Sequence, residues 1–181
     1  MSNFVHLHVH TEYSLLDGLS KIPKLLERAK HQGMDTLAIT DHGAMYGAVH
    51  FYLKAKEAGV KPIIGVETYQ AQRSRYDKEG SIDSDPNHLL LLAKTTIGYQ
   101  NLLKLITAAH LEGFYYKPRV DWELIERYHQ GLIATSACLQ GVVSQSLLHK
   151  EPAKAKAYVN RMLKIFGDDF YLEVQAHPKI E

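Results

Sequence analysis

Short apolar runs alternate along the chain with longer stretches in which apolar residues recur every three or four positions. The short runs predict strands, and the longer stretches predict amphipathic helices that bury one face. We expect strands at 4–9, 36–39, 61–67, 88–92, 132–135 and 170–174. This regular exchange of strand and helix indicates an α/β fold with parallel strands covered by helices.

Capping residues mark the ends of the predicted helices. Ser20 is a candidate N-cap for a first helix that ends near Gly33, and a second helix ends near Gly59. Further helices are expected around 102–106 and at 121–128, 141–150 and 152–166. The segment 72–87 is rich in Gly, Ser, Asp and Pro, so we expect a loop there.

Composition changes this picture little. Hydrophobic residues make up 45% of the chain, charged residues 23%, and the net charge is +1, all ordinary for a globular protein. A net charge this small gives no strong electrostatic field that would indicate binding to nucleic acid or to a membrane. No apolar run is long enough to cross a bilayer. The single cysteine, Cys138, excludes an internal disulfide. Together with the lack of a signal-peptide pattern, it predicts a cytoplasmic protein.

Three histidines stand at alternate positions near the start, at His6, His8 and His10. In an extended strand such residues project from one face. Histidine is the commonest metal ligand, and it binds as the neutral ring. A solvated strand face would explain one isolated pair, but other ligand-type residues follow later apolar runs, so we interpret the row as part of a metal site.

These later residues follow the predicted strands. Parallel β/α folds gather function at the carboxyl ends of their strands. The candidate ligands at this rim are His8, His10, Asp17, His42, Glu67 and Cys138. Asp41 is a candidate for orienting a ligand from behind, as carboxylates beside metal-bound imidazoles commonly do.

The mixture of imidazoles, carboxylates and one thiol favours zinc or manganese. More than four candidate ligands imply more than one divalent ion, with Glu67 as a natural bridge. Paired metals activate water and stabilise an in-line phosphoryl displacement, so phosphoester hydrolysis is the predicted reaction class. The sequence has no phosphate-binding loop, dinucleotide fingerprint or serine-hydrolase elbow.

Several residues have simpler interpretations. His6 lies deeper in its predicted strand than His8 and His10, and His88 opens its apolar run instead of closing it. Cys138 alone would more often be a small buried hydrophobe. The aromatic run 114–116 could stack on nucleic acid, but a packed loop is the preferred interpretation. The remaining histidines are expected to be solvated: His31, His50, His110, His129, His149 and His177.

The segments 8–11, 40–43 and 65–67 resemble motifs of the polymerase and histidinol phosphatase (PHP) superfamily. The segments 6–18, 98–102, 112–118 and 131–139 are more specifically similar to the PHP domains at the start of bacterial replicative DNA polymerase III alpha subunits. The resemblance covers essentially the whole chain, 1–181.

This resemblance implies a distorted (β/α)7-type PHP barrel with a trinuclear metal site, so we expect two or three divalent metal ions, zinc or manganese. It also implies three groups of ligands, one for each ion. The first group is His8, His10 and Glu67, the second is Glu67, His88 and Cys138, and the third includes Asp17 and His42. The superfamily pattern includes a later Asp-x-His that this chain lacks, so we expect a PHP domain that is incomplete at its C-terminal end, before its last strands. The polymerase palm, fingers and thumb are also absent, and the piece is not expected to polymerise DNA.

Three functions are compatible with the sequence. The preferred one is a metal-dependent phosphoesterase of a DNA-replicating polymerase, acting as a 3′–5′ proofreading exonuclease on the 3′ primer end, with other replicase subunits as partners. The second is a structural or docking module that binds metal only for stability. The third is a stand-alone PHP phosphatase, which the polymerase-like segments after Gly98 disfavour.

Overall fold

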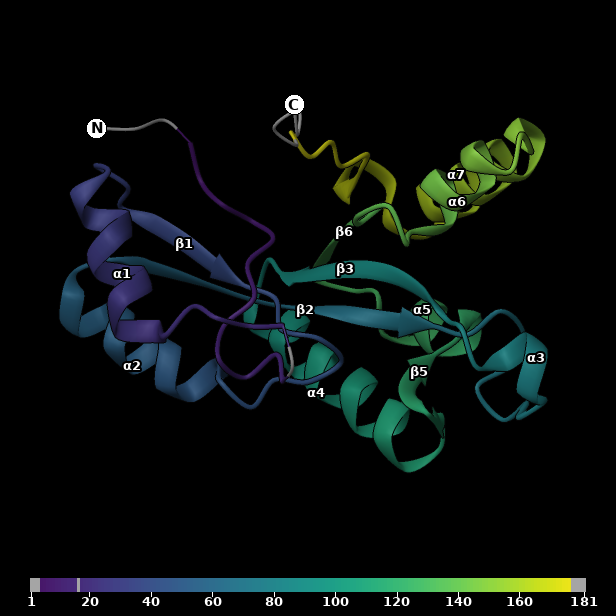
Figure 1. Cartoon of the computed structure of the whole chain (residues 1–181), viewed down its shortest axis with the longest axis horizontal. Coiled ribbons are helices and arrows are strands. Elements are labelled where there is room, and N and C mark those ends of the chain that lie inside the picture. The colour runs from purple at the N-terminus through teal and green to yellow at the C-terminus, as the bar shows by residue number, and fades with distance from the viewer. Residues whose placement is uncertain (1–3, 16, 177–181) are drawn as a thin grey trace.

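The computed structural model describes residues 4–15 and 17–176. Among them, one mixed sheet is flanked by helices (Figure 1). Its strands are β1 (Thr36–Ile39), β2 (Lys61–Gln70), β3 (Asn87–Ala93), β4 (Phe114–Tyr115), β5 (Lys117–Val120), β6 (Leu132–Thr135) and β7 (Phe170–Tyr171). The helices are α1 (Ile22–His31), α2 (Ala48–Ala58), α3 (Gly80–Asp83), α4 (Thr96–Leu111), α5 (Trp122–Tyr128), α6 (Val142–Leu148) and α7 (Pro152–Phe166), with a 3₁₀ turn at Gly167–Asp169.

The long strand β2 organises the sheet. One edge of β2 pairs in parallel with β1 and then with β5, and the other edge pairs antiparallel with β3. The next strand, β6, is antiparallel to β3 and parallel to β7. The prediction of an α/β fold is confirmed, but the prediction of parallel strands throughout is wrong. A parallel return needs a crossover helix, and the segment between β2 and β3 contains only the one-turn helix α3.

The first predicted strand, at 4–9, does not form a regular strand. Its carbonyls at His6 and Val9 accept from the amides of Ala38 and Thr40 at 3.1 and 2.8 Å. The segment therefore advances three residues while its partner advances two, and this extra residue breaks the ladder as a bulge does.

Other boundaries differ from prediction by a few residues. Strand β2 continues to Gln70, so Glu67 lies inside the strand and does not end it. The last strand ends at Tyr171, and the N-cap of α1 is Lys21 and not Ser20. The predicted loop contains α3, and the aromatic run takes part in the β4–β5 hairpin.

Two apolar clusters cover the sheet. Helices α4, α5 and α7 pack against Val66, Leu89 and Leu91, and α1 and α2 pack around β1 with Phe51 fully buried. Side chains alternate between the faces of a strand, so Glu67, next to Val66, faces away from the larger cluster. The face opposite α4 and α5 therefore carries the candidate chemistry. No helix in the described part of the chain is both long and apolar enough to span a bilayer.

Candidate metal centre

The carboxylate of Glu67, only 1% exposed, lies at the centre of a ring of four imidazoles. Its Oε1 atom lies 3.2 Å from Nε2 of His8 and 2.9 Å from Nδ1 of His88. Its Oε2 atom lies 3.3 Å from Nε2 of His10 and 2.8 Å from Nδ1 of His42. Three segments that are distant in sequence thus bring their histidines to one buried carboxylate.

The two other predicted ligands lie beside this ring. Asp17 Oδ2 is 2.9 Å from Nε2 of His42, on the side away from Glu67. The Cys138 sulfur is 3.5 Å from both Glu67 Oε1 and His88 Nδ1. The structure therefore brings together all seven residues that the sequence and the resemblance proposed as ligands.

The mixed sheet explains how His88 reaches the site. Because β3 runs antiparallel to β2, the start of β3 lies beside the end of β2, and His88 pairs with Tyr69. Tyr69 is on the same face as Glu67, two residues away. Its position at the start of a strand, which by itself argued only weakly for His88, therefore brings it to the site because that strand is antiparallel to β2.

A tight turn after His42 brings its ring over the same face. Gly43 has φ +56°, and a Cβ there would lie 2.9 Å from both Pro118 and Tyr69. Only glycine combines that backbone conformation with this close approach. The Gly43 carbonyl accepts a hydrogen bond from Nε2 of His110 at 2.9 Å, so the prediction that His110 is merely solvated is wrong.

The buried Asp41 holds the first histidine segment in place. It accepts hydrogen bonds from the backbone N–H and the hydroxyl of Thr11, at 2.6 and 2.8 Å, and from the hydroxyl of Ser14 at 2.6 Å. The Ser14 hydroxyl also contacts Nδ1 of His10 at 2.9 Å. Asp41 therefore acts behind His10 and not as one of the converging ligand groups.

Glu173 is a site residue that the sequence reasoning missed. Its Oε1 atom lies 2.6 Å from Nδ1 of His8, and its other oxygen accepts from the Thr135 hydroxyl. Its backbone N–H donates to the Ser136 hydroxyl at 2.9 Å. This carboxylate fixes the ring of His8 with Nε2 directed at Glu67, the arrangement by which outer carboxylates orient metal-binding imidazoles. Its position near the end of the predicted strand 170–174 was the available signal.

The charges of the cluster shift its pKa values strongly. Burial alone would raise the pKa of Glu67, but the close contacts with the four imidazoles outweigh it and hold that pKa well below its usual range. Burial lowers the pKa of His8, but Glu173 and Glu67 outweigh it and raise that pKa to about 9. The pKa of His42 is raised by Glu67 and Asp17 against the effect of burial. Burial raises the pKa of the Cys138 thiol.

The donor atoms fit divalent metal ions. Among the buried side-chain atoms of the described residues, only His42 Nδ1 and Glu67 Oε2 lack a hydrogen-bond partner, although they lie 2.8 Å apart. Nε2 of His8 and Nε2 of His10 also converge, at 3.3 Å, while each Nδ1 has its own partner. Converging lone pairs of this kind are costly without a cation between them. Two groups of three residues could each hold an ion, and Glu67 belongs to both. One group is His8, His10 and Glu67, and the other is His42, Glu67 and His88.

Residues outside the ring define its surroundings. The site opens into a cleft of about 1260 Å³, and the segments 4–8 and 171–176 are among those that line it. His6 is exposed and its ring packs edge-on against Phe4 at 4.8 Å, outside both groups of ligand atoms. The remaining predicted solvated histidine near the C-terminus, His177, lies outside the described residues.

Replacing Glu173 with glutamine should change how the metal-free protein responds to pH. His8 has a pKa of about 9 in the folded chain against an ordinary 6.5. Its ion pairs therefore stabilise the fold fully below about pH 6.5, and this stabilisation is lost as the pH rises through 9. In Glu173→Gln the loss should be smaller and the His8 ring should titrate lower.

The measurement is thermal unfolding in EDTA between pH 6 and 10, with NMR titration of the imidazoles. Zinc or manganese affinity should also fall by about 10–100-fold, as when other outer carboxylates are removed. Glu57→Gln, an exposed carboxylate on α2, is the matched control. An unchanged pH slope and unchanged metal affinity in Glu173→Gln would contradict the role assigned to this residue.

A mixed α/β fold with carboxylates, imidazoles and a thiol gathered on one sheet face defines a candidate multi-metal domain. Comparison with known families agrees: the PHP domain family model matches residues 6–177. The chain therefore belongs to the PHP domain family.

Its relatives among characterised proteins are large. The chain is 49% identical over 177 residues to the DNA polymerase III subunit alpha of Borreliella burgdorferi, covering 97% of this chain and 15% of that protein. It is 47% identical over 181 residues to the same subunit of Aquifex aeolicus, covering 97% and 16%. Among solved structures, an amidohydrolase from Chromobacterium violaceum aligns with a TM-score of 0.42 and 22% identity over 58% of this chain and 32% of that one. The chain thus spans about 15% of the length of these polymerase subunits.

Proposed function

We propose that this chain is a metal-dependent phosphoesterase domain that acts as a 3′–5′ exonuclease on DNA. The observation that carries the proposal is the buried Glu67 carboxylate, shared by four imidazoles whose free nitrogens converge on it. A carboxylate shared between two groups of histidines is the arrangement expected of a bridging ligand. Paired cations suit phosphoester hydrolysis, because they can stabilise both the attacking and the leaving oxygen.

Some residues of such a site would bind the metal ions, and others hold the metal-binding residues in position. Divalent ions, zinc or manganese by the chemistry of the donors, would supply an activated water and neutralise the phosphate charge. The residues that would hold them are His8, His10 and Glu67; Glu67, His88 and Cys138; and Asp17 with His42. Asp41, through Ser14, keeps His10 in position, and Glu173 does the same for His8. The cleft along 4–8 and 171–176 gives a strand end access to this face.

The choice of DNA as substrate rests on similarity to the DNA polymerase III alpha subunits. We propose the 3′ primer end as the substrate, other replicase subunits as partners and the cytoplasm as the location. Because the chain spans about 15% of those subunits, the polymerising activity is proposed to lie outside residues 1–181. The same similarity disfavours a stand-alone phosphatase.

The test uses the intact gene product with a primer–template carrying a 3′ mismatch, without deoxynucleoside triphosphates so that synthesis cannot mask degradation. Manganese or zinc should support release of mononucleotides from the 3′ end, and EDTA should stop it. His10→Ala should lower the rate by at least about 100-fold, because a ligand matters at least as much as the groups that orient it. His31→Ala, an exposed histidine at the end of α1, should leave the rate unchanged.

A metal-stabilised structural or docking module is the competing function. It is favoured by the extent to which the cluster ties distant segments together, from the segment at His8 to the segment at Glu173. If metal raises the melting temperature but no nucleotide is released, or if His10→Ala releases nucleotides at the normal rate, the exonuclease proposal fails. In the first case the structural function replaces it.

A further inference from the structure

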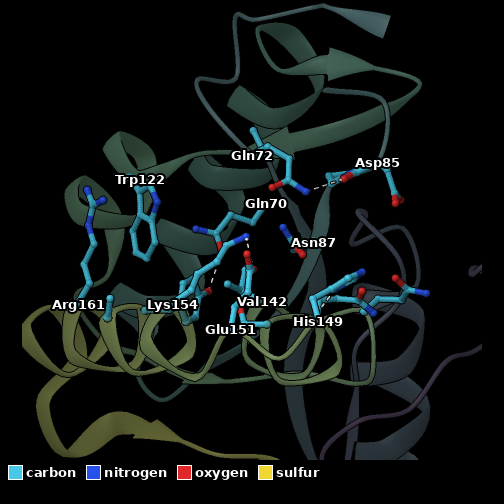
Figure 2. Close-up of a pocket in the computed structure, with 17 residues that line it drawn as sticks. Gln70, Gln72, Asp85, Asn87, Trp122, Val142, His149, Glu151, Lys154 and Arg161 are labelled. Atoms are coloured by element: carbon cyan, nitrogen blue, oxygen red, sulfur yellow. Dashed lines mark hydrogen bonds and ion pairs between the residues drawn. The ribbon is translucent and has the colours of Figure 1, made fainter. Parts of the chain in front are cut away.

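A second pocket, of about 470 Å³, lies beside α6 and α7 (Figure 2). Gln70 and Asn87, at the adjoining ends of β2 and β3, both line it. They alternate with Tyr69 and His88, so they point to the sheet face opposite the metal centre. The pocket is therefore separate from the proposed nuclease site, although the same two strands carry both.

One wall of this pocket is aromatic. Trp122, the only tryptophan of the chain, lies between Arg161 and Gln70 in Figure 2. The Arg161 guanidinium covers one face of the indole, with Cζ 3.9 Å from the ring centroid. The phenol ring of Tyr158 lies 5.2 Å from the indole. Trp122 and Arg161 both line the pocket, so together they form a wall of flat groups against which a planar ligand can stack.

The opposite wall is built from side-chain amides. Five carboxamides line the pocket: Gln70, Gln72, Asn87, Gln140 and Gln145. Gln70 is 2% exposed, and its Oε1 accepts from the Tyr158 hydroxyl at 2.7 Å. Its Nε2 group has no hydrogen-bond acceptor within the described part of the chain, and Figure 2 shows the side chain directed into the pocket. Nε2 is not one of the fully buried unpaired atoms, so it keeps some exposure toward the pocket and is free to donate to an acceptor on a ligand.

The charges at the pocket are balanced. Lys154 contacts Glu151 at 3.3 Å, and Arg161 contacts Glu126 at 2.8 Å. These cations are therefore partly neutralised, and the pocket is not primarily an anion site. A neutral, planar ligand with adjacent donors and acceptors fits both the carboxamides and the indole. Nucleobases have that chemistry, since carboxamides pair with base edges and aromatic rings stack on base faces.

We propose that this pocket binds the base of a nucleoside or nucleotide, stacked against the wall formed by Trp122 and Arg161 and hydrogen-bonded at its edge by Gln70 and Asn87. Its volume lies within the range of small-ligand sites. A short peptide also carries donors and acceptors, but it does not need a flat stacking wall. The loop at Cys138–Gly141 separates the two sites: the backbone N–H of His88 donates to the Gln140 carbonyl at 3.0 Å, and Gln145 donates to the Leu139 carbonyl at 2.7 Å. A bound base would therefore leave the metal centre free.

The single tryptophan makes the test direct, because its fluorescence reports on this pocket alone. The chain is titrated in EDTA, so that phosphate cannot bind through metal, with the four deoxynucleosides, their 5′-monophosphates, deoxyribose 5-phosphate and capped tripeptides. At least one deoxynucleoside should give a saturable change in Trp122 emission. The affinity for the corresponding 5′-monophosphate should be within about threefold of the affinity for that deoxynucleoside, because the base supplies the recognition. Deoxyribose 5-phosphate should give no change.

Two substitutions test whether the side-chain amides of Gln70 and Asn87 bind the base. Gln70→Glu keeps an acceptor for Tyr158 but removes the free donor, and affinity should fall by about tenfold, the value of one hydrogen bond. If Gln70→Glu does not fold, Asn87→Ala replaces it in the test, because this substitution disturbs the packing less. Asn87→Ala should also lower the affinity for the deoxynucleoside. Gln100→Glu, exposed on α4, is the matched control and should bind normally.

No saturable change with any deoxynucleoside would overturn the proposal. So would a response to deoxyribose 5-phosphate or to tripeptides alone, or normal binding by folded Gln70→Glu and Asn87→Ala. The measurement is made without metal and without DNA cleavage, so its failure would not bear on the proposed nuclease, and a failed nuclease assay would not bear on this pocket.

Discussion

Glu67→Gln is expected to abolish tight metal binding and to lower nuclease activity by at least about 100-fold. The carboxylate faces four imidazoles, with contacts of 2.8–3.3 Å from both of its oxygens. Glutamine has the same shape but no charge, and its amide nitrogen would donate where a cation must bind. Both three-residue groups of ligand atoms include Glu67, so one substitution damages both.

Isothermal titration with zinc and manganese, and the rise in melting temperature on adding either metal, measure this effect. The wild-type chain should be stabilised by metal, because ions that bind only the folded state shift its unfolding equilibrium. Glu67→Gln should lose most of this increase. Glu27→Gln, an exposed carboxylate on α1 outside the metal centre, is the matched control and should keep its full response. Normal metal affinity in Glu67→Gln would contradict the central position of this residue.

The local sequence pattern predicted most of the fold. The strands 36–39 and 132–135 and the helix 152–166 lie where apolar spacing placed them. The direction of the strands could not be predicted in the same way, because apolar runs buried on both faces look alike in parallel and antiparallel sheets. The information lay in the connection between β2 and β3, where a polar segment without a long helix permits an antiparallel return.

The candidate site shows the same limit. His8, His10 and His42 were found because histidines at strand ends are conspicuous in a sequence. Judged by position alone, His88 was undervalued, because that judgement assumed a parallel strand. Glu173 was missed because its role depends on a contact across 165 residues, between its carboxylate and the His8 ring. Local patterns identify residue types that can bind metal, but only the assembled sheet shows which carboxylate supports which imidazole.

The charged network under the polar segment was also invisible to local reasoning. That segment was predicted as a loop, yet Arg119, on β5, is fully buried beneath it. Its guanidinium donates to the carbonyls of Gly113, Arg75 and Asp77 at 2.8–2.9 Å and to that of Asp83 at 3.1 Å. One side chain thus satisfies backbone carbonyls in several turns of the connection between β2 and β3.

Arg119→Ala should therefore destabilise the protein by about 3–5 kcal/mol, because it removes hydrogen bonds from a charged group and leaves several buried carbonyls unsatisfied. Urea unfolding measures the change, and Arg28→Ala, an exposed arginine near the end of α1, should stay within about 0.5 kcal/mol of wild type. The connection leads directly into Asn87 and His88, so loosening it should also weaken metal binding. A small loss of stability in Arg119→Ala would mean that water replaces the guanidinium, and that the segment is held by Arg75 and its ion pair with Asp121 instead.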